Sequence, residues 1–461
     1  MLPLLGFLRN KNLIFYNMQS SISYKQIFQI SLPLIIASLG HSLIGATDTF
    51  FLGRSGNTTY LAAIGLIAPL YLTITLVGLA LSRGGQIMIA RRLGDGELSK
   101  VGLIARNMFY FEMALAVFFF IAIYYFGYYL LAAFIDSPDL LQISLEYLEY
   151  RVFGVFFGCA GVVFISLYTG VARTSIIIQS SVVIAVVNIV LNYGLIFGNL
   201  GMPEMGMNGA GLASAIAEGF GVLAFIIFAF FDKQSKEYQL FKRSNIDFDE
   251  ISKQLKLSAP IALQSFLGVM SWVVFFGLIE NLGEIPMAVS SVMRVIYLFI
   301  GAIAWGVGSG TNTIISMLIG QEKQKEVLPT LHRITLFTVV FTAVAGSILL
   351  FIPDVIVQLI TDETSVINGS IDMMGMVFII LVNLAIYNIY YNGIVGTGDI
   401  KHGLLITVTS VIIYMTYVAL VVNVFKLDLY WAWSAEIVYG AVALVMSLYY
   451  LKKGKWGKLS V

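Results

Sequence analysis

Long uninterrupted runs of apolar residues constrain most strongly what this chain can fold into. They recur between residues 27 and 451, and short polar breaks separate them. A helix that crosses a bilayer needs about 20 apolar residues, whereas a membrane-spanning barrel shows short segments of alternating character. The runs here are continuous and rich in Leu, Ile and Phe. The sequence therefore predicts an all-α polytopic membrane protein.

Twelve transmembrane helices account for the apolar runs. Their expected bounds are 27–53, 61–90, 104–130, 146–171, 176–198, 209–231, 254–281, 287–319, 331–360, 371–396, 403–425 and 430–451. The composition agrees, because 59% of the residues are hydrophobic and only 11% are charged. Soluble domains carry about 25% charged residues. This composition excludes a soluble globular chain and a disordered one.

Basic residues are distributed unevenly over the polar breaks. Most of the 27 Lys and Arg residues fall in alternate breaks, and the breaks between those are acidic or neutral. Loops that stay in the cytoplasm are enriched in Lys and Arg. The alternation predicts that both termini are cytoplasmic, as in a multi-pass protein of the bacterial inner membrane.

The segments on either side of the central polar break resemble each other. SLP at 31–33 recurs as SAP at 258–260, and LGDGELSKV at 93–101 recurs as IGQEKQKEV at 319–327. Each half holds six helices and begins on the same side of the membrane, which defines a parallel internal repeat. Two such lobes enclose a cleft near the bilayer midplane, and this arrangement is typical of transporters that work by alternating access.

The repeat also divides the chain into five parts. We expect a cytoplasmic N-terminal segment at 1–26, an N-lobe at 27–231, a cytoplasmic linker at 232–253, a C-lobe at 254–451 and a basic cytoplasmic tail at 452–461.

Polar side chains inside the first-lobe helices are candidates for function. Asp48 lies well inside an apolar run, and Asn188 and Asn192 are four residues apart, as are Ser214 and Glu218. Residues spaced by four share one helix face. An ionisable group in hydrocarbon costs several kcal/mol, so each one is a functional hypothesis. Structural alternatives remain for all five residues, because buried amides and carboxylates also join helices.

The second lobe offers fewer polar candidates. Glu280 and Arg294 flank the LGEIP turn between two helices, so we expect an ion pair near the outer tip of that hairpin. Alternatively, Arg294 meets Glu218 or another acid across the cleft. Glu436 lies near a helix end, where it can reach the interface, and so does Glu112 in the first lobe. Tyr387, Tyr390 and other tyrosines pack between helices or line a cavity for cations.

Several function classes lack support in the sequence. There is no basic tract suited to nucleic acid, and the single Cys159 excludes internal disulfides and cysteine-rich metal sites. No HExxH or GxSxG motif is present. We therefore expect no enzyme and no cofactor.

Several segments together resemble the multidrug and toxic compound extrusion (MATE) family of antiporters. They are SLPLIIASLGHSLIGATDTFFLG, GGQIMIARRLGDGE, VVNIVLNYGLIFG, NGAGLASAIAE and VGTGDIKHG. The resemblance implies that Asp48 is central to cation coupling, with Asn188, Asn192 and Ser214 completing its site. The acids of a second-lobe sodium site in the NorM branch would fall near Gly268 and Leu384, where this chain has none. Coupling is therefore expected to rest on the first lobe.

Residues and resemblance together predict a secondary active transporter that expels organic, cationic amphipathic compounds by antiport with H⁺ or Na⁺. A carboxylate that binds H⁺ or Na⁺ becomes neutral, and an unneutralised one attracts an organic cation. If the ion is Na⁺, Asp48, Asn188 and Asn192 supply its oxygen ligands. We expect Asp48, Glu218, Glu280, Arg294 and Tyr387 to line the substrate cavity.

The expected partners are a small-molecule substrate and the lipid bilayer, and we expect a monomer. The alternative function is a flippase for lipid-linked precursors, which shares this general architecture. An anionic headgroup would need an arginine-rich cavity, and the acids within the apolar runs outnumber the bases.

Overall fold

The computed structural model describes residues 22–55, 58–132, 135, 137–242, 245–361, 363–453 and 456. Within this part of the chain the structure is helical and contains no strand. The elements are α2 (Tyr24–Arg54), α3 (Thr58–Gly94), α4 (Leu98–Ala132), α5 (Pro138–Arg151), α6 (Gly154–Gly170), α7 (Ser175–Phe197), α8 (Gly206–Phe231), α9 (Lys233–Glu237), α10 (Phe248–Ile279), η1 (Glu280–Leu282), α11 (Glu284–Gly320), η2 (Gln324–Glu326), α12 (Val327–Gly346), α13 (Ile348–Phe351), α14 (Pro353–Gln358), α15 (Thr364–Thr397), α16 (Ile400–Ala419), η3 (Leu420–Val424), α17 (Leu429–Trp433) and α18 (Ala435–Lys453).

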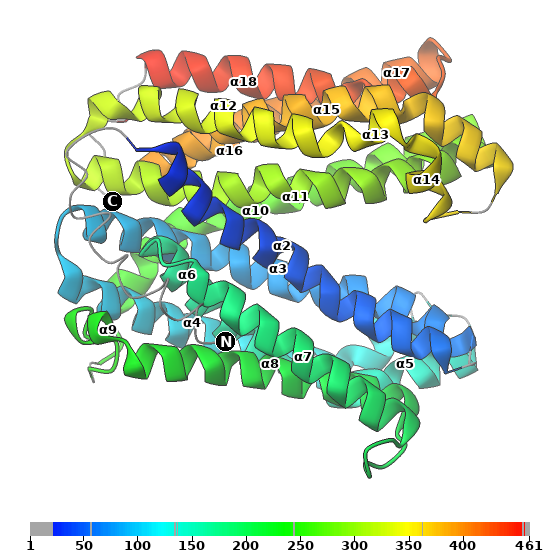
Figure 1. Cartoon of the computed structure of the whole chain (residues 1–461), viewed down its shortest axis with the longest axis horizontal. Coiled ribbons are helices and arrows are strands. Elements are labelled where there is room, and N and C mark those ends of the chain that lie inside the picture. The colour runs from blue at the N-terminus through cyan, green and yellow to red at the C-terminus, as the bar shows by residue number, and fades with distance from the viewer. Residues whose placement is uncertain are drawn as a thin grey trace.

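The long helices form two bundles that lie side by side (Figure 1). The first bundle contains α3 to α8, and the second contains α10, α11, α12, α15, α16 and α18. Helix α2 runs along the boundary and packs on α7 of the first bundle and on α11 of the second. Most of the predicted terminal segments, 1–26 and 452–461, lie outside the described residues.

Ten helices in the described part of the chain are long and apolar enough to cross a membrane. The number rises to eleven if α5 and α6 form one span, which bends by 54° between them. The sequence predicts one continuous helix over 146–171, and this prediction is wrong at the bend. The backbone turns at Val152 and Phe153, and Arg151 becomes the last residue of α5.

Other helix bounds also differ from the expected ones, and two of the differences follow from the local sequence. Helix α10 begins at Phe248, inside the predicted linker, because the Asp247 side chain accepts a hydrogen bond from the Glu250 amide (3.0 Å) and caps the helix. The predicted helix 331–360 is divided into α12, α13 and α14, and α14 starts at Pro353. Proline is favoured in the first turn of a helix and disfavoured further in.

Polar contacts join the two bundles at one end. Gln86 Nε2 donates to Thr313 Oγ1 (3.1 Å), and Ser258 Oγ accepts from the Gly84 amide (3.0 Å). Further along α3, the Arg91 guanidinium donates a hydrogen bond to the Thr397 carbonyl of α15 (2.9 Å). In Figure 1 the ribbons of the two bundles diverge from this joint toward α5 and α14. We call this set of contacts the polar joint.

Candidate functional site

The Asp48 carboxylate lies at the centre of a buried hydrogen-bond cluster near the end of α2. Asn188 Nδ2 (3.2 Å) and Asn192 Nδ2 (2.7 Å) donate to its Oδ1 atom, and Ser214 Oγ donates to Oδ2 (2.7 Å). Tyr147 of α5 adds a longer hydrogen bond to Oδ2 (3.3 Å). The structure thus brings together the four residues that the sequence singled out for cation coupling, and Tyr147 is an addition.

The cluster is tightly interconnected and closed to solvent. Asn188 Nδ2 also reaches Ser214 Oγ (2.9 Å), and Asn192 Nδ2 reaches Asn188 Oδ1 (3.3 Å). Asp48 is 1% exposed, and both asparagines and Ser214 are fully buried. Among the described residues, Asn192 Oδ1 is buried without a hydrogen-bond partner. Because Asn192 meets Asp48 through Nδ2, this oxygen can serve a ligand at the carboxylate if the amide rotates.

A second charged group lies beside this cluster. Arg151 at the end of α5 pairs with Glu218 of α8 through two hydrogen bonds, Nη2 to Oε1 (2.6 Å) and Nη1 to Oε2 (2.8 Å). Its guanidinium also lies 3.5 Å from the ring centroid of Tyr71 and donates to the Tyr71 hydroxyl (2.8 Å). This geometry is the strong, bidentate form of an ion pair.

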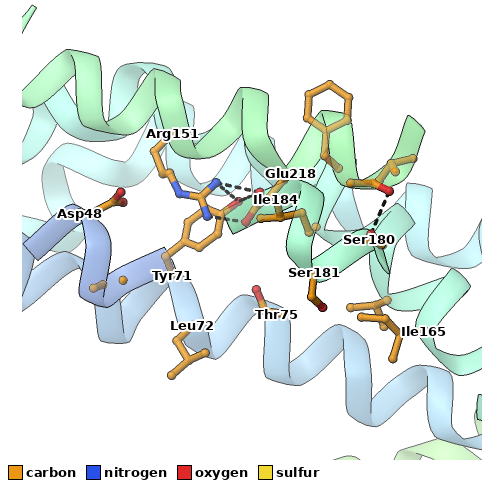
Figure 2. Close-up of a pocket in the computed structure, with 18 of the residues that line it drawn as sticks. Asp48, Tyr71, Leu72, Thr75, Arg151, Ile165, Ser180, Ser181, Ile184 and Glu218 are labelled. Atoms are coloured by element: carbon orange, nitrogen blue, oxygen red, sulfur yellow. Dashed lines mark hydrogen bonds and ion pairs between the residues drawn. The ribbon is translucent and has the colours of Figure 1, made fainter. Parts of the chain in front are cut away.

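Asp48, Arg151 and Glu218 face one cavity of about 340 Å³ within the first bundle (Figure 2). Tyr71 and Thr75 of α3 and apolar residues of α6, α7 and α8 form much of its remaining wall. Ligand cavities typically measure about 300–1,000 Å³ and combine an apolar wall with a few polar groups. The cavity has these properties.

Two other residues expected in the substrate cavity lie elsewhere. Arg294 and Tyr387 line a separate cavity of about 390 Å³ in the second bundle. Glu280 lines neither of these cavities and is exposed, because α10 ends at Ile279 and Glu280 belongs to the short turn η1. Its expected place in the cavity is wrong.

The predicted Glu280–Arg294 ion pair is also wrong, since no such pair is found among the described residues. The Arg294 guanidinium instead lies 4.9 Å from the ring centroid of Phe276. The alternative partner, Glu218, is occupied by Arg151.

Two acids that we expected to extend toward the interface are instead buried within the protein. Glu112 is fully buried between helices and accepts a hydrogen bond from Ser82 Oγ (2.8 Å), and Glu436 is 7% exposed. Arg151 was missed as a site residue because it stands in an apolar segment that resembles a continuous span. Its charge at that depth was the signal that could have identified it. No cluster of three metal-ligating His, Cys, Asp or Glu side chains occurs in the described part of the chain.

Paired helical bundles in a membrane, with a buried carboxylate at the wall of an internal cavity, define a secondary transporter. Comparison with known proteins identifies the family. The MatE family model matches residues 33–194 and 260–420. The chain therefore belongs to the MATE family, whose members are multidrug efflux transporters and not enzymes.

Curated relatives agree with this assignment. The chain is 24% identical over 455 residues to a probable multidrug resistance protein NorM of Thermotoga maritima, covering 95% of this chain and 94% of that protein. A protein of the same description from Idiomarina loihiensis is 22% identical over 388 residues, which is 84% of each chain.

Solved structures share the fold. The Vibrio cholerae MATE transporter VcmN in its bent form superimposes with a TM-score of 0.83 at 18% identity, over 93% of this chain and 97% of that one. A MOP superfamily transporter from Pyrococcus furiosus gives 0.80 at 19% identity, over 93% and 96%.

Proposed function

We propose that this protein exports organic cations by antiport and that Asp48 binds the coupling ion and governs substrate release. The observation that carries the proposal is the set of partners around Asp48. In the part of the chain that the structure describes, four side chains donate hydrogen bonds to this buried carboxylate, and all four are neutral groups of α5, α7 and α8. A carboxylate with neutral partners can alternate between a charged and a neutralised state, whereas one in an ion pair is already neutralised.

The charge of the cavity supports a cationic substrate. Two carboxylates, Asp48 and Glu218, and one guanidinium, Arg151, face it. With Asp48 ionised the cavity carries one net negative charge, and with Asp48 neutralised it carries none. An organic monocation balances the first state and is released by the second.

The side chains around Asp48 can accommodate either H⁺ or Na⁺ as the coupling ion. A protonated Asp48 would need an acceptor, which Asn192 Oδ1 offers if its amide rotates. Na⁺ would need oxygen ligands, which Asp48 supplies directly and which Asn188 and Asn192 supply if their amides rotate. Metal-ligand chemistry of this kind uses carboxylate and amide oxygens.

A flippase for lipid-linked precursors finds less support. Its phosphate-bearing headgroup needs unpaired basic groups, and the arginine that faces this cavity is engaged by Glu218. We therefore retain cation export.

The membrane arrangement is part of the proposal. The Lys- and Arg-rich breaks indicate twelve spans with both termini in the cytoplasm of a bacterial inner-membrane protein, which acts as a monomer. In this arrangement the polar joint, which includes Arg91 and Thr397, lies on the cytoplasmic side. The two bundles then diverge toward the outside of the cell.

The test is efflux of ethidium from proteoliposomes that contain the full-length protein, under an imposed pH gradient or an imposed Na⁺ gradient. Wild-type protein should respond to one of the two gradients. Asp48→Asn keeps the shape of the side chain but cannot change charge, so it should abolish gradient-driven efflux while expression is unchanged. Asp354→Asn is the matched control, because Asp354 is an exposed carboxylate at the start of α14. Normal efflux by the Asp48 variant would overturn the proposal.

A further inference from the structure

A second cavity, of about 390 Å³, lies in the second bundle between α10, α11, α15, α16 and α18. None of its lining residues belongs to the Asp48 cavity. Its wall is unusually aromatic. The rings are those of Trp272, Tyr297, Trp305, Tyr387, Tyr414 and Tyr439. Rings of this kind attract cations placed over their faces, and cages of them recognise quaternary ammonium groups.

One carboxylate belongs to this aromatic cavity. Glu436, in the first turn of α18, lines it and is 7% exposed. No ion pair within 4.0 Å joins Glu436 to a basic side chain in the part of the chain that the structure describes. A buried carboxylate without a basic partner is costly, so a cation that enters the cavity would be stabilised there.

Tyr414 is a neutral neighbour of the same carboxylate. It is 2% exposed and lines the cavity, and its hydroxyl is directed at Glu436. A hydroxyl can donate a hydrogen bond to the carboxylate but does not neutralise its charge. A cation in the cavity would therefore still be needed to balance Glu436.

Arg294 supplies the basic group of the same cavity but does not neutralise Glu436. Its side chain is exposed at the cavity wall, and its guanidinium lies against the Phe276 ring, 4.9 Å from the centroid. An arginine in this position can compete with an incoming cation for the carboxylate and for the aromatic rings.

The position of the cavity within the repeat is informative. The two segments that match the family model end at residues 194 and 420, and the same offset relates Asn188 to Tyr414. By this offset Tyr414 corresponds to Asn188, which donates a hydrogen bond to Asp48 in the first bundle. The carboxylate, however, comes from α18 and not from the helix that corresponds to α2.

We propose that this aromatic cavity is a second binding site for an organic monocation of the quaternary ammonium or phosphonium class. Glu436 is the counter-ion, the tyrosine and tryptophan rings form the walls, and Arg294 is an internal competitor. The inference rests on the proposed export of organic cations for the class of ligand. It does not depend on Asp48 as the coupling group.

The experiment measures equilibrium binding of tetraphenylphosphonium to purified full-length protein, without any ion gradient and in the Asp48→Asn background. Binding should persist in this background. Glu436→Gln should weaken it by tenfold or more, because the counter-ion is removed. Arg294→Gln should strengthen it several-fold, because the competing cation is removed. Glu280→Gln is the matched control and should change nothing, since Glu280 is exposed outside both cavities.

Binding is expected to weaken in Glu436→Gln and to strengthen in Arg294→Gln. Loss of folding would weaken binding in both variants, so the two results together distinguish the proposal from loss of folding. Arg294 is exposed, so its variant tests the site even if the Glu436 variant is unstable. Unchanged binding in both variants, or weaker binding in Arg294→Gln, would overturn the second site. Normal gradient-driven efflux by Asp48→Asn would instead overturn the coupling role of Asp48 and leave these binding results intact.

Discussion

At the scale of single residues, the two carboxylates of the first cavity differ in what surrounds them. Asp48 accepts hydrogen bonds from two amides and two hydroxyls, whereas Glu218 is held by the Arg151 guanidinium at 2.6 and 2.8 Å. Only the first environment leaves the charge of the carboxylate free to change. The cavity therefore contains one carboxylate whose charge can change, Asp48, and one whose charge is fixed by an ion pair, Glu218.

The two asparagines should act as one unit. Asn188 and Asn192 both donate to Asp48 Oδ1 and are hydrogen-bonded to each other. We expect Asn188→Ala and Asn192→Ala to weaken the ion dependence of ethidium efflux non-additively, with an interaction free energy of about 0.5–3 kcal/mol. A double-mutant cycle on the half-maximal ion concentration measures it. Additive, small effects would favour a purely structural role for both amides.

Loss of one partner from the buried ion pair should destabilise the protein. Glu218→Gln leaves the Arg151 guanidinium buried and uncompensated, and such changes cost about 3–5 kcal/mol. The thermal unfolding midpoint of the detergent-purified protein should fall clearly. The double variant Glu218→Gln with Arg151→Gln removes both charges and should recover part of that loss. A double variant as unstable as the single one would contradict this account.

At the scale of elements, the sequence predicts much of the architecture because apolar length and helical spacing are local properties. The four-residue spacing of Asn188 and Asn192 correctly puts both amides on one face of α7, toward Asp48. The sequence does not predict the bend between α5 and α6, because the apolar character of the chain continues across it. The exposed Glu280 and the buried Glu112 and Glu436 were also missed, because their positions depend on how neighbouring helices end and pack.

The bend can be tested at Gly154, the first residue of α6. A Cβ atom there would meet Arg151 Nη1, Glu218 Oε2 (2.8 Å) and the Tyr71 hydroxyl (2.9 Å). Gly154→Ala should therefore disturb the ion pair and reduce both the unfolding midpoint and efflux. Gly375→Ala in α15 is the matched control, because a Cβ atom there meets nothing within 4 Å and Gly375 lines neither cavity. Equal effects of the two substitutions would show that general helix propensity is responsible.

At the scale of the whole molecule, the two bundles are joined near one end of the long helices. The joint depends on close approach: a Cβ atom on Gly84 would meet Ser258 Oγ and the Gln254 carbonyl oxygen, the latter at 2.5 Å. Helices with small residues at their contact can approach closely in a membrane. The arrangement of the bundles should therefore respond to substitutions in this joint.

Gly84→Ala should shift the population away from the arrangement seen here. Spin labels at Glu204→Cys, in the connection between α7 and α8, and at Leu359→Cys, directly after α14, occupy exposed positions and report the separation of the two bundles. The α7–α8 connection and α14 lie at the end toward which the bundles diverge (Figure 1). We expect the label distance to shorten in the Gly84 variant, as the joint opens and the other end closes. Gly65→Ala on the same helix should leave the distance unchanged, because a Cβ atom there meets nothing within 4 Å. An unaltered distance in Gly84→Ala would exclude a role for the joint.

The chemistry of the joint also sets how easily the two bundles can part. A hydrogen bond contributes about 0.5–1.5 kcal/mol net, so the three bonds described above are worth only a few kcal/mol together. Because these bonds re-form when the bundles come together again, they cost no net work over a full cycle. A ligand that favours the parted arrangement by a few kcal/mol is enough to shift the population toward it. Exchange of one H⁺ or Na⁺ for one organic monocation moves no net charge, so we expect the concentration gradient of the ion, and not the membrane potential, to drive export.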